Sequence, residues 1–436
     1  MTRRFRITAS LAAFALVLAA CQSESSPGGG GDGDISGETV SVLVVWGGAE
    51  LESFQAMVAP WEEETGATIE VESTRDIDAV LQTRVEGGTP PDVAGLPGPG
   101  VMAQFARDGA LKELPQSVQD VLDAEYDPGW AVAGTVDDQL VGVFIKTALK
   151  GLIWYNPAQF EAAGYSVPED WDGMTALVDQ MVDDGVTPWG IGLESGAATG
   201  WPGTDWIEDF VLRQSGPDVY DAWVAGEQAW TSPEITEAFE AFLTWASDDT
   251  YVDGGPSVVL GTAFGNGGDC LFADPPDCYL HHQASFMGGS AGFFETNFPG
   301  VATAGETYDF FVMPSIEFNG VTSSGDLFGM FNDTPAAQSL MTWLVSAEAQ
   351  QIWVERGGAL SANKEVALDA YPDETGRRSA EGLTGAETVR FDASDLFPAE
   401  MGAAFLSAIV DGVQNPDNLD SILADLDEVQ ASAYGS

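Results

Sequence analysis

A glycine-rich stretch from Ser195 to Trp206 holds the side chains best suited to bind a ligand. It places two tryptophans, Trp201 and Trp206, beside a carboxylate, Asp205. A sugar ring has an apolar C–H face on which an indole can stack, and its hydroxyls donate hydrogen bonds to a carboxylate. The stretch therefore indicates carbohydrate binding. A structural alternative remains open, in which Trp201 packs under the loop and Asp205 caps a helix that begins at Trp206.

Patterns that would indicate catalysis are weak. The two histidines of the chain, His281 and His282, are adjacent, which gives little support to a serine–histidine–aspartate triad. The sequence contains no GxxxxGK(S/T) phosphate loop and no HExxH motif. A glycosidase needs a pair of catalytic carboxylates, and a chain with 69 Asp and Glu residues could supply one. No two of these residues stand out as such a pair. We expect a binding protein rather than an enzyme, with no cofactor.

The charge balance limits the class of partner. Fifteen Lys and Arg face 69 Asp and Glu, which gives a formal net charge of −54. This balance disfavours nucleic-acid binding and polybasic contact with anionic lipid, since both depend on clustered cations. Hydrophobic residues make up 44% of the chain, which is enough to build a core. The acidic residues therefore predict a soluble surface, suited to salty surroundings.

The first twenty residues are typical of a secretory signal. A basic start precedes the apolar run Ile7–Leu18, which is too short to span a bilayer as a mature helix. The run ends in Leu-Ala-Ala-Cys21, which resembles a bacterial lipobox, and residues 22–37 are a Gly- and Ser-rich tether. We expect lipidation at Cys21 and a protein held on the outer face of the cell membrane. An ordinary signal peptide with a chance Cys21 is the alternative.

The two remaining cysteines, Cys270 and Cys278, bracket a turn-rich loop. In an oxidising exterior, an isolated close pair predicts a disulfide. A metal site with His281 and His282 is the alternative, but the sequence has no further Cys or His to complete a tetrahedral set.

Alternation of strands and helices indicates an α/β fold. Residues 39–46, 68–71 and 91–96 are expected strands, and helical patterns follow each of them. We expect the chain to cross between lobes near 146–150 and again near Pro314. Five tryptophans in helical contexts are expected to lie in the core: Trp223, Trp230, Trp245, Trp343 and Trp353.

Several motifs, in order along the mature chain, resemble the extracellular solute-binding proteins of ABC sugar transporters. They are Trp46-Gly47-Gly48, Gly151–Pro157, Pro168 with Trp171, Gly325-Asp326, 331–335, 346–350 and 356–364. Gly200–Trp206 and 282–286 look most like the α-glucoside-binding branch of this family.

The resemblance implies a periplasmic-binding-protein-like fold, with two doubly wound α/β lobes joined by crossing strands and a sugar cleft between them. The implied lobes are 38–147 plus about 315–375, and 148–314 plus about 376–436. The family also implies a monomer that delivers an oligosaccharide to membrane permease subunits.

The candidate ligand-binding residues follow from the tryptophan stretch and from the family motifs. They are Trp46, Glu50, Lys146, Tyr155, Trp201, Asp205, Trp206, Gln283, Phe286, Asp326 and Arg356. Family members often carry an Asp near the turn at 97–100, where this chain has Pro and Gly. The sequence leaves two alternatives to sugar capture: a secreted glycoside hydrolase, and a binding protein for another solute such as a polyamine or a metal.

Overall fold

The computed structural model describes residues 34–96, 98–126 and 128–435. The described residues from Ile35 onward form one compact unit. The expected signal peptide, Cys21 and most of the tether lie outside the described residues. Within the described part of the chain, no helix is both long and apolar enough to cross a bilayer.

The larger sheet has six strands. They are β1 (Thr39–Val44), β2 (Thr68–Ser73), β3 (Val93–Leu96), β6 (Gly142–Leu149), β10 (Val321–Met330) and β11 (Val389–Phe391). The order is β11-β10-β3-β1-β2, and β6 pairs with β10. Strand β1 lies parallel to both β2 and β3. The strand–helix alternation predicted for this region is therefore confirmed.

Helices α1 to α5 and a hairpin complete the N-terminal part. Their bounds are α1 (Gly48–Thr65), α2 (Ile77–Glu86), α3 (Pro99–Arg107), α4 (Gln116–Glu125), α5 (Pro128–Ala133), β4 (Thr135–Val136) and β5 (Gln139–Leu140). Gly66 ends α1 in the left-handed conformation, and its N–H donates to the carbonyl of Glu62. The local capping signals in the sequence thus mark real helix ends.

The smaller sheet has three strands in the order β8-β7-β9, and neighbouring strands are antiparallel. The strands are β7 (Leu152–Tyr155), β8 (His281–Gln283) and β9 (Asp309–Val312). The first helices around it are α6 (Pro157–Ala163), α7 (Trp171–Asp183), α8 (Trp201–Ser215), α9 (Pro217–Val224), α10 (Pro233–Ala246), α11 (Pro256–Gly261) and α12 (Phe293–Asn297). The predicted cap Asp170 accepts a hydrogen bond from the N–H of Gly173 at the start of α7.

The C-terminal helices return to both sheets. They are α13 (Pro335–Leu344), α14 (Ala347–Arg356), α15 (Glu374–Gly385), α16 (Ala393–Leu396), α17 (Ala399–Gln414) and α18 (Leu419–Ala433). The helical region expected from Pro335 to Arg356 is divided into α13 and α14. Ser346 separates them, because its side chain accepts a hydrogen bond from the N–H of Ala349 and starts a new helix.

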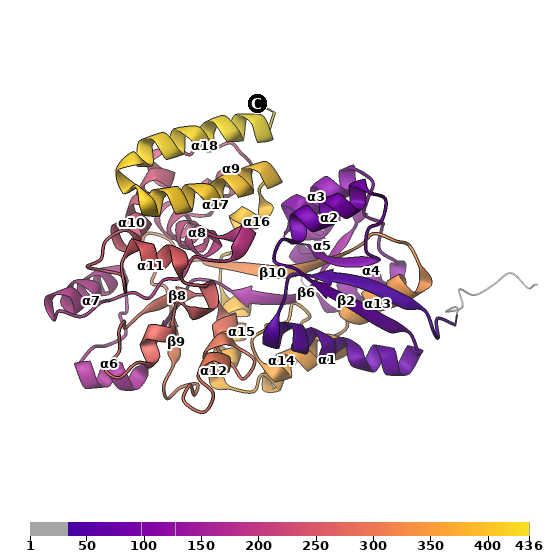
Figure 1. The fold of residues 1–436 in the computed structure, drawn as a ribbon, viewed down its shortest axis with the longest axis horizontal. Helices are drawn as coiled ribbons and strands as arrows, with labels where there is room; N and C mark the ends of the chain where they lie inside the picture. The colour runs from indigo at the N-terminus through magenta and orange to yellow at the C-terminus, as the bar shows by residue number, and fades with distance from the viewer. Residues whose placement is uncertain (1–33, 97, 127, 436) are drawn as a thin grey trace, which may run out of the picture. The chain divides into compact units, whose positions relative to one another are not determined.

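Two long strands, β6 and β10, lie side by side in an antiparallel ladder (Figure 1). The register runs from Ser323 opposite Leu149 to Gly329 opposite Gly142. The crossing expected near 146–150 is therefore β6. The crossing expected near Pro314 follows β9: the chain leaves β9 at Val312, passes Pro314 and enters the crossing strand β10 at Val321.

Two large clusters of buried apolar side chains define two lobes. The first cluster draws on Ile35–Ile145 and Leu327–Ala362, and the second on Ile153–Met313 and Ala393–Leu426. We call these clusters and their elements the first lobe and the second lobe. Four of the five expected core tryptophans are buried: Trp223, Trp230, Trp245 and Trp353. Trp343 is half-buried against the first cluster.

Candidate ligand-binding site

A cavity of about 400 Å³ is lined by residues of both lobes. The first lobe contributes segments that follow the carboxyl ends of β1, β2 and β3, and the second lobe contributes α8 and residues 392–406. Residues of β6 and β10 line it as well. Open α/β sheets bind their ligands beyond the carboxyl ends of strands, so this cavity is where the fold places a ligand.

The first-lobe wall carries a lysine between two carboxylates. Lys146 Nζ lies 2.8 Å from Glu50 Oε1 and 3.5 Å from Asp326 Oδ2. Burial alone would lower the pKa of Lys146, but Asp326 and Glu50 raise it above its usual value, so the ammonium stays charged. Trp46 Nε1 donates to Asp326 Oδ1 at 3.0 Å. This group, the Lys146 cluster, presents an indole and fixed charges to the cavity.

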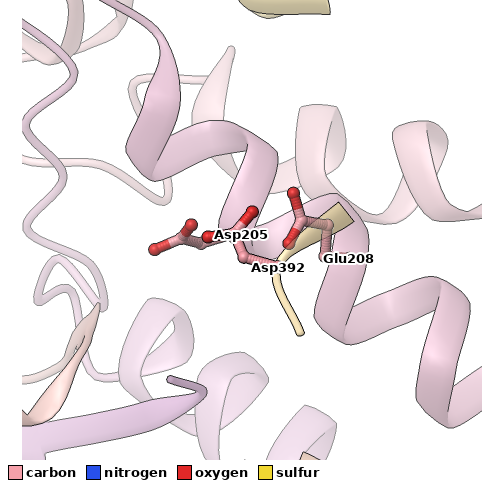
Figure 2. Close-up of side chains that lie close together, drawn as sticks. All are labelled: Asp205, Glu208 and Asp392. Carbon is pink, nitrogen blue, oxygen red and sulfur yellow. The ribbon is translucent and has the colours of Figure 1, made fainter. Parts of the chain in front are cut away.

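The second-lobe wall carries a similar and more deeply buried group. Lys150 Nζ lies 2.7 Å from Asp205 Oδ1 and 2.8 Å from Asp392 Oδ2. Figure 2 shows Asp205 and Glu208 on α8 beside Asp392, which precedes α16. We call Lys150 and these three carboxylates the Lys150 cluster. Burial would lower the pKa of Lys150, but Asp205 and Asp392 raise it well above its usual value.

The carboxyl groups of the Lys150 cluster differ in how readily they hold a proton. Burial and the neighbouring Asp392 raise the pKa of Glu208, and burial raises that of Asp205 although Lys150 opposes the shift. Lys150 and the interaction with Glu208 lower the pKa of Asp392 despite its burial. The oxygens of Asp205, Glu208 and Asp392 are close enough to suit a metal ion. The Lys150 ammonium already lies between two of them, so we assign no metal here.

Four aromatic rings form a continuous wall of the cavity. Trp201 lies 5.1 Å from Phe264 and 6.1 Å from Phe286, measured between ring centroids, and Phe293 lies 5.2 Å from Phe264. All four are half-buried and line the cavity. We call them the aromatic wall. An apolar face of a ligand ring can stack there, while its polar rim faces the two lysine clusters.

Seven of the eleven candidate residues line the cavity: Trp46, Glu50, Lys146, Trp201, Asp205, Phe286 and Asp326. The helix that the sequence placed at Trp206 begins at Trp201, after Gly200 in a left-handed conformation. Trp201 and Asp205 are four residues apart and share one face of α8. Asp205 is therefore a helix-interior residue and not the cap.

The other four candidates lie outside the cavity lining. Trp206 is turned into the second core, where it stacks on His282 at 4.1 Å between centroids. Gln283 is buried in β8, and its Oε1 accepts from the N–H of Ala284. Arg356 Nε donates to Ser53 Oγ, and Tyr155 packs on Phe160. Trp206 follows Asp205 directly in α8, and neighbouring residues of a helix point to different faces, so of these two only Asp205 lines the cavity.

The sequence did not identify several cavity residues. They are Arg75, Lys150, Phe264, Phe293, Asp392 and Asp395. The rarity of lysine was a usable signal for Lys150, since the chain has four lysines. Asp392 and Asp395 had no local signal, because the contact of residues 392–395 with α8 joins segments far apart in the chain.

The predicted disulfide between Cys270 and Cys278 is formed. Gly190 makes room for it, since a β-carbon there would lie 2.2 Å from Cys270 Sγ.

Two α/β lobes, crossing strands and a cavity between the lobes define the class of the bacterial solute-binding proteins. The family model described as "Bacterial extracellular solute-binding protein" matches residues 47–351, and the chain belongs to this family. Members are the substrate-binding components of ABC transporters and act outside the cytoplasm.

Curated relatives cover almost the whole chain. The osmoprotective compounds-binding protein GgtB of Synechocystis sp. is 37% identical over 95% of this chain and 96% of its own length. The alpha-glucosides-binding periplasmic protein AglE of Rhizobium meliloti is 36% identical over 89% of this chain and 86% of its own length. Among solved structures, a chitin oligosaccharide binding protein superposes with a TM-score of 0.78 at 18% identity, covering 92% of this chain and all of that one. The predicted fold class is thereby confirmed.

Proposed function

We propose that the chain captures a neutral carbohydrate, an α-glucoside, in the cavity between its lobes and delivers it to an ABC permease. The observation that carries this proposal is that the aromatic wall and the two lysine–carboxylate clusters line the same cavity. Stacking on the rings and charge-assisted hydrogen bonds to the hydroxyls are how proteins hold sugars. The relative AglE is an alpha-glucosides-binding protein, which supports the same ligand class.

The size of the cavity favours a short ligand. Small-molecule sites range from roughly 300 to 1,000 Å³, and this cavity is about 400 Å³. We therefore propose a short α-glucoside in preference to a long oligosaccharide chain.

Capture requires each lobe to move as a rigid body. We propose lobes close to those expected from the sequence: 38–147 plus about 315–375, and 148–314 plus about 376–436. One boundary moves. Val354, Leu360, Tyr371 and Ala380 pack in a third apolar cluster with residues of the smaller sheet such as Trp154. We place the return to the second lobe just after Asn363, because Ala359 and Ala362 still pack in the first cluster and Asn363 donates to Glu125.

The protein acts, in this proposal, as a lipid-anchored monomer on the outer face of the membrane, through Cys21 and the tether after it. It binds without catalysis. Recovery of an unchanged sugar after incubation supports binding, and appearance of a hydrolysis product would show a glycoside hydrolase.

A cationic solute such as a polyamine is the second candidate, because carboxylates outnumber cations along the cavity. The lining acids are Glu50, Asp76, Asp78, Asp205, Asp326, Asp392 and Asp395, against Arg75, Lys146 and Lys150. We favour a neutral ligand because each of the two lysines already pairs with two of these carboxylates, so Glu50, Asp326, Asp205 and Asp392 all have a cation within the protein.

The first prediction concerns ligand class and Trp201. In a thermal-shift screen of α-glucosides, other sugars, amines and metal ions, we expect α-glucosides to raise the melting temperature most. Trp201→Ala should then weaken calorimetric affinity for the best sugar at least tenfold, because the stacking surface is lost. Trp343→Ala is the matched control, since Trp343 is half-buried on α13 outside the cavity lining. Equal affinity of wild type and Trp201→Ala contradicts this site, and a response to amines alone contradicts the sugar.

A further inference from the structure

The turn between β3 and α3 contains two glycines that the backbone does not require. Gly98 is extended, with φ −178°, and precedes Pro99 at the first turn of α3. Gly100 lies within that turn and has no positive φ. Alanine could adopt either conformation, so the reason for glycine must be sought in what faces these positions.

Both glycines face main-chain atoms of residues 395–397. A β-carbon on Gly98 would lie 2.6 Å from the carbonyl oxygen of Asp395, and one on Gly100 would lie 2.0 Å from that of Phe397. These distances are shorter than van der Waals contact, and a main-chain carbonyl cannot rotate away as a flexible side chain can. The approach of α3 to this segment is therefore possible only without side chains at 98 and 100.

The two sides of this contact belong to different lobes. Met102 and Phe105 bury α3 in the first cluster, whereas Ala393 and Phe397 belong to the second cluster. We call it the α3–α16 contact. A second contact between the lobes lies nearby, where the Arg75 guanidinium lies 5.2 Å from the centroid of the Phe264 ring. Both contacts border the cavity, because Gly98, Arg75, Phe264 and Asp395 line it. Separation of the lobes would break both.

The electrostatics favour the same arrangement. The carbonyls of Asp395 and Phe397 at the end of α16 face the first turn of α3, and the free N–H groups of a helix start carry partial positive charge. Opposite partial charges thus meet where the backbones come closest.

We propose that Gly98 and Gly100 are positioning residues for ligand capture: by lacking side chains they let the two lobes close against each other at the α3–α16 contact. This inference rests on the proposed function, since closure matters only for a captured solute. At this turn, where family members often carry an Asp, this chain brings the two backbones together instead.

The test compares Gly98→Ala and Gly100→Ala with the wild type. Each added methyl meets a carbonyl only in the closed arrangement, so we expect at least tenfold weaker calorimetric affinity and a smaller ligand-induced decrease of the radius of gyration in small-angle scattering. The ligand-free melting temperature should be unchanged, or higher for Gly100→Ala, because alanine favours a helix more than glycine does. This combination separates a closure defect from a folding defect.

Gly129→Ala is the matched control. Gly129 lies in helix α5, and a β-carbon there would meet no heavy atom of the described residues within 4 Å. Its affinity should equal that of the wild type.

Two results overturn the inference. If both variants bind with wild-type affinity, the contact does not limit closure. If the ligand-free melting temperature falls and the scattering response to ligand is unchanged, the contact is also present in the open state. Failure of the proposed function is distinct, because the wild type then binds no sugar. The same comparison with whichever solute the screen finds then still tests the contact.

Discussion

The imidazole of His281 is buried and surrounded by main-chain atoms. Its Nδ1 lies 2.8 Å from the carbonyl oxygen of Gly190, and the ring packs against Gly267 and Gly268. Burial lowers the pKa of His281 to about 4. The neutral ring with hydrogen on Nδ1 is therefore the form that the fold accepts, because a charged ring would lose its hydration without gaining a counter-ion.

The pH dependence of stability follows from the sign of this shift. The folded pKa lies below the usual 6.5, so the stabilisation is present above pH 6.5 and is lost as the pH falls toward about 4. We expect this residue to lower the free energy of unfolding by about 2–3 kcal/mol between pH 7 and pH 4.5. His281→Asn keeps a donor near the Nδ1 position and should show a shallower pH profile in denaturant titrations. Parallel profiles would contradict this assignment.

Trp201, Asp205 and Trp206 show which parts of the site could be predicted from residue type. Trp201 and Asp205 were found because their types match sugar chemistry, and both line the cavity. Trp206 has the same chemistry and lies next to Asp205, yet it is a core residue on His282. Residue type identified candidates, but the face of α8 decided which of them reach the cavity.

The turn between β6 and β7 packs against a buried group of charged residues in the second lobe, Asp209, Arg213 and His282. Gly151 has φ 70°, and a β-carbon there would lie 2.7 Å from Asp209 Oδ2. Asp209 pairs with Arg213 at 2.6 Å and with His282 at 2.7 Å. Burial would raise the pKa of Asp209, but Arg213 and His282 lower it to about 2, so this carboxylate stays charged in the core.

Gly151→Ala should therefore lower the free energy of unfolding by much more than the backbone strain of an alanine at positive φ would. Gly88→Ala is the matched control, since Gly88 also has φ 70° and no described heavy atom would lie within 4 Å of its β-carbon. We expect a loss of about 1 kcal/mol for Gly88→Ala from the left-handed conformation. Gly151→Ala should lose about 3 kcal/mol or more, because a buried ion pair is disturbed as well. Equal losses in chemical denaturation would show that the Asp209 network tolerates the methyl.

At the level of elements, the sequence predicted what local physics controls. Asp170 caps the start of α7 and Gly66 caps the end of α1, in line with the capping preferences of these residue types. The chain crosses after Pro314 as expected, but which strand makes the crossing depends on long-range pairing: β9 and β10 are both strands, and only the ladder of β10 with β6 distinguishes them. Local patterns do not contain that information.

For the whole molecule, the net charge of −54 is a surface property. The deeply buried carboxylates Asp205, Asp209 and Asp392 are paired with Lys150 or Arg213. The remaining acids repel one another and keep the chain soluble, which suits a protein exposed outside the cell.

The anchor is a prediction at the same scale. We expect the wild type in the membrane fraction of producing cells, because a lipidated Cys21 adds buried acyl chains to the molecule. Cys21→Ser should move the protein to the soluble or secreted fraction without changing its affinity for ligand, since Cys21 is not among the described residues that line the cavity. An equal distribution of wild type and variant between fractions would contradict the anchor.

The sequence by itself determined the fold class, the strand–helix alternation, the disulfide and the aromatic and acidic character of the site. These features depend on residue types and on spacings within one element. Only the tertiary structure decided the Lys150 cluster, the aromatic wall and the α3–α16 contact. Each joins segments distant in the chain, such as α8 with Asp392 or Gly98 with Asp395. Their proximity results from packing two lobes around the shared strands β6 and β10, which no local pattern encodes.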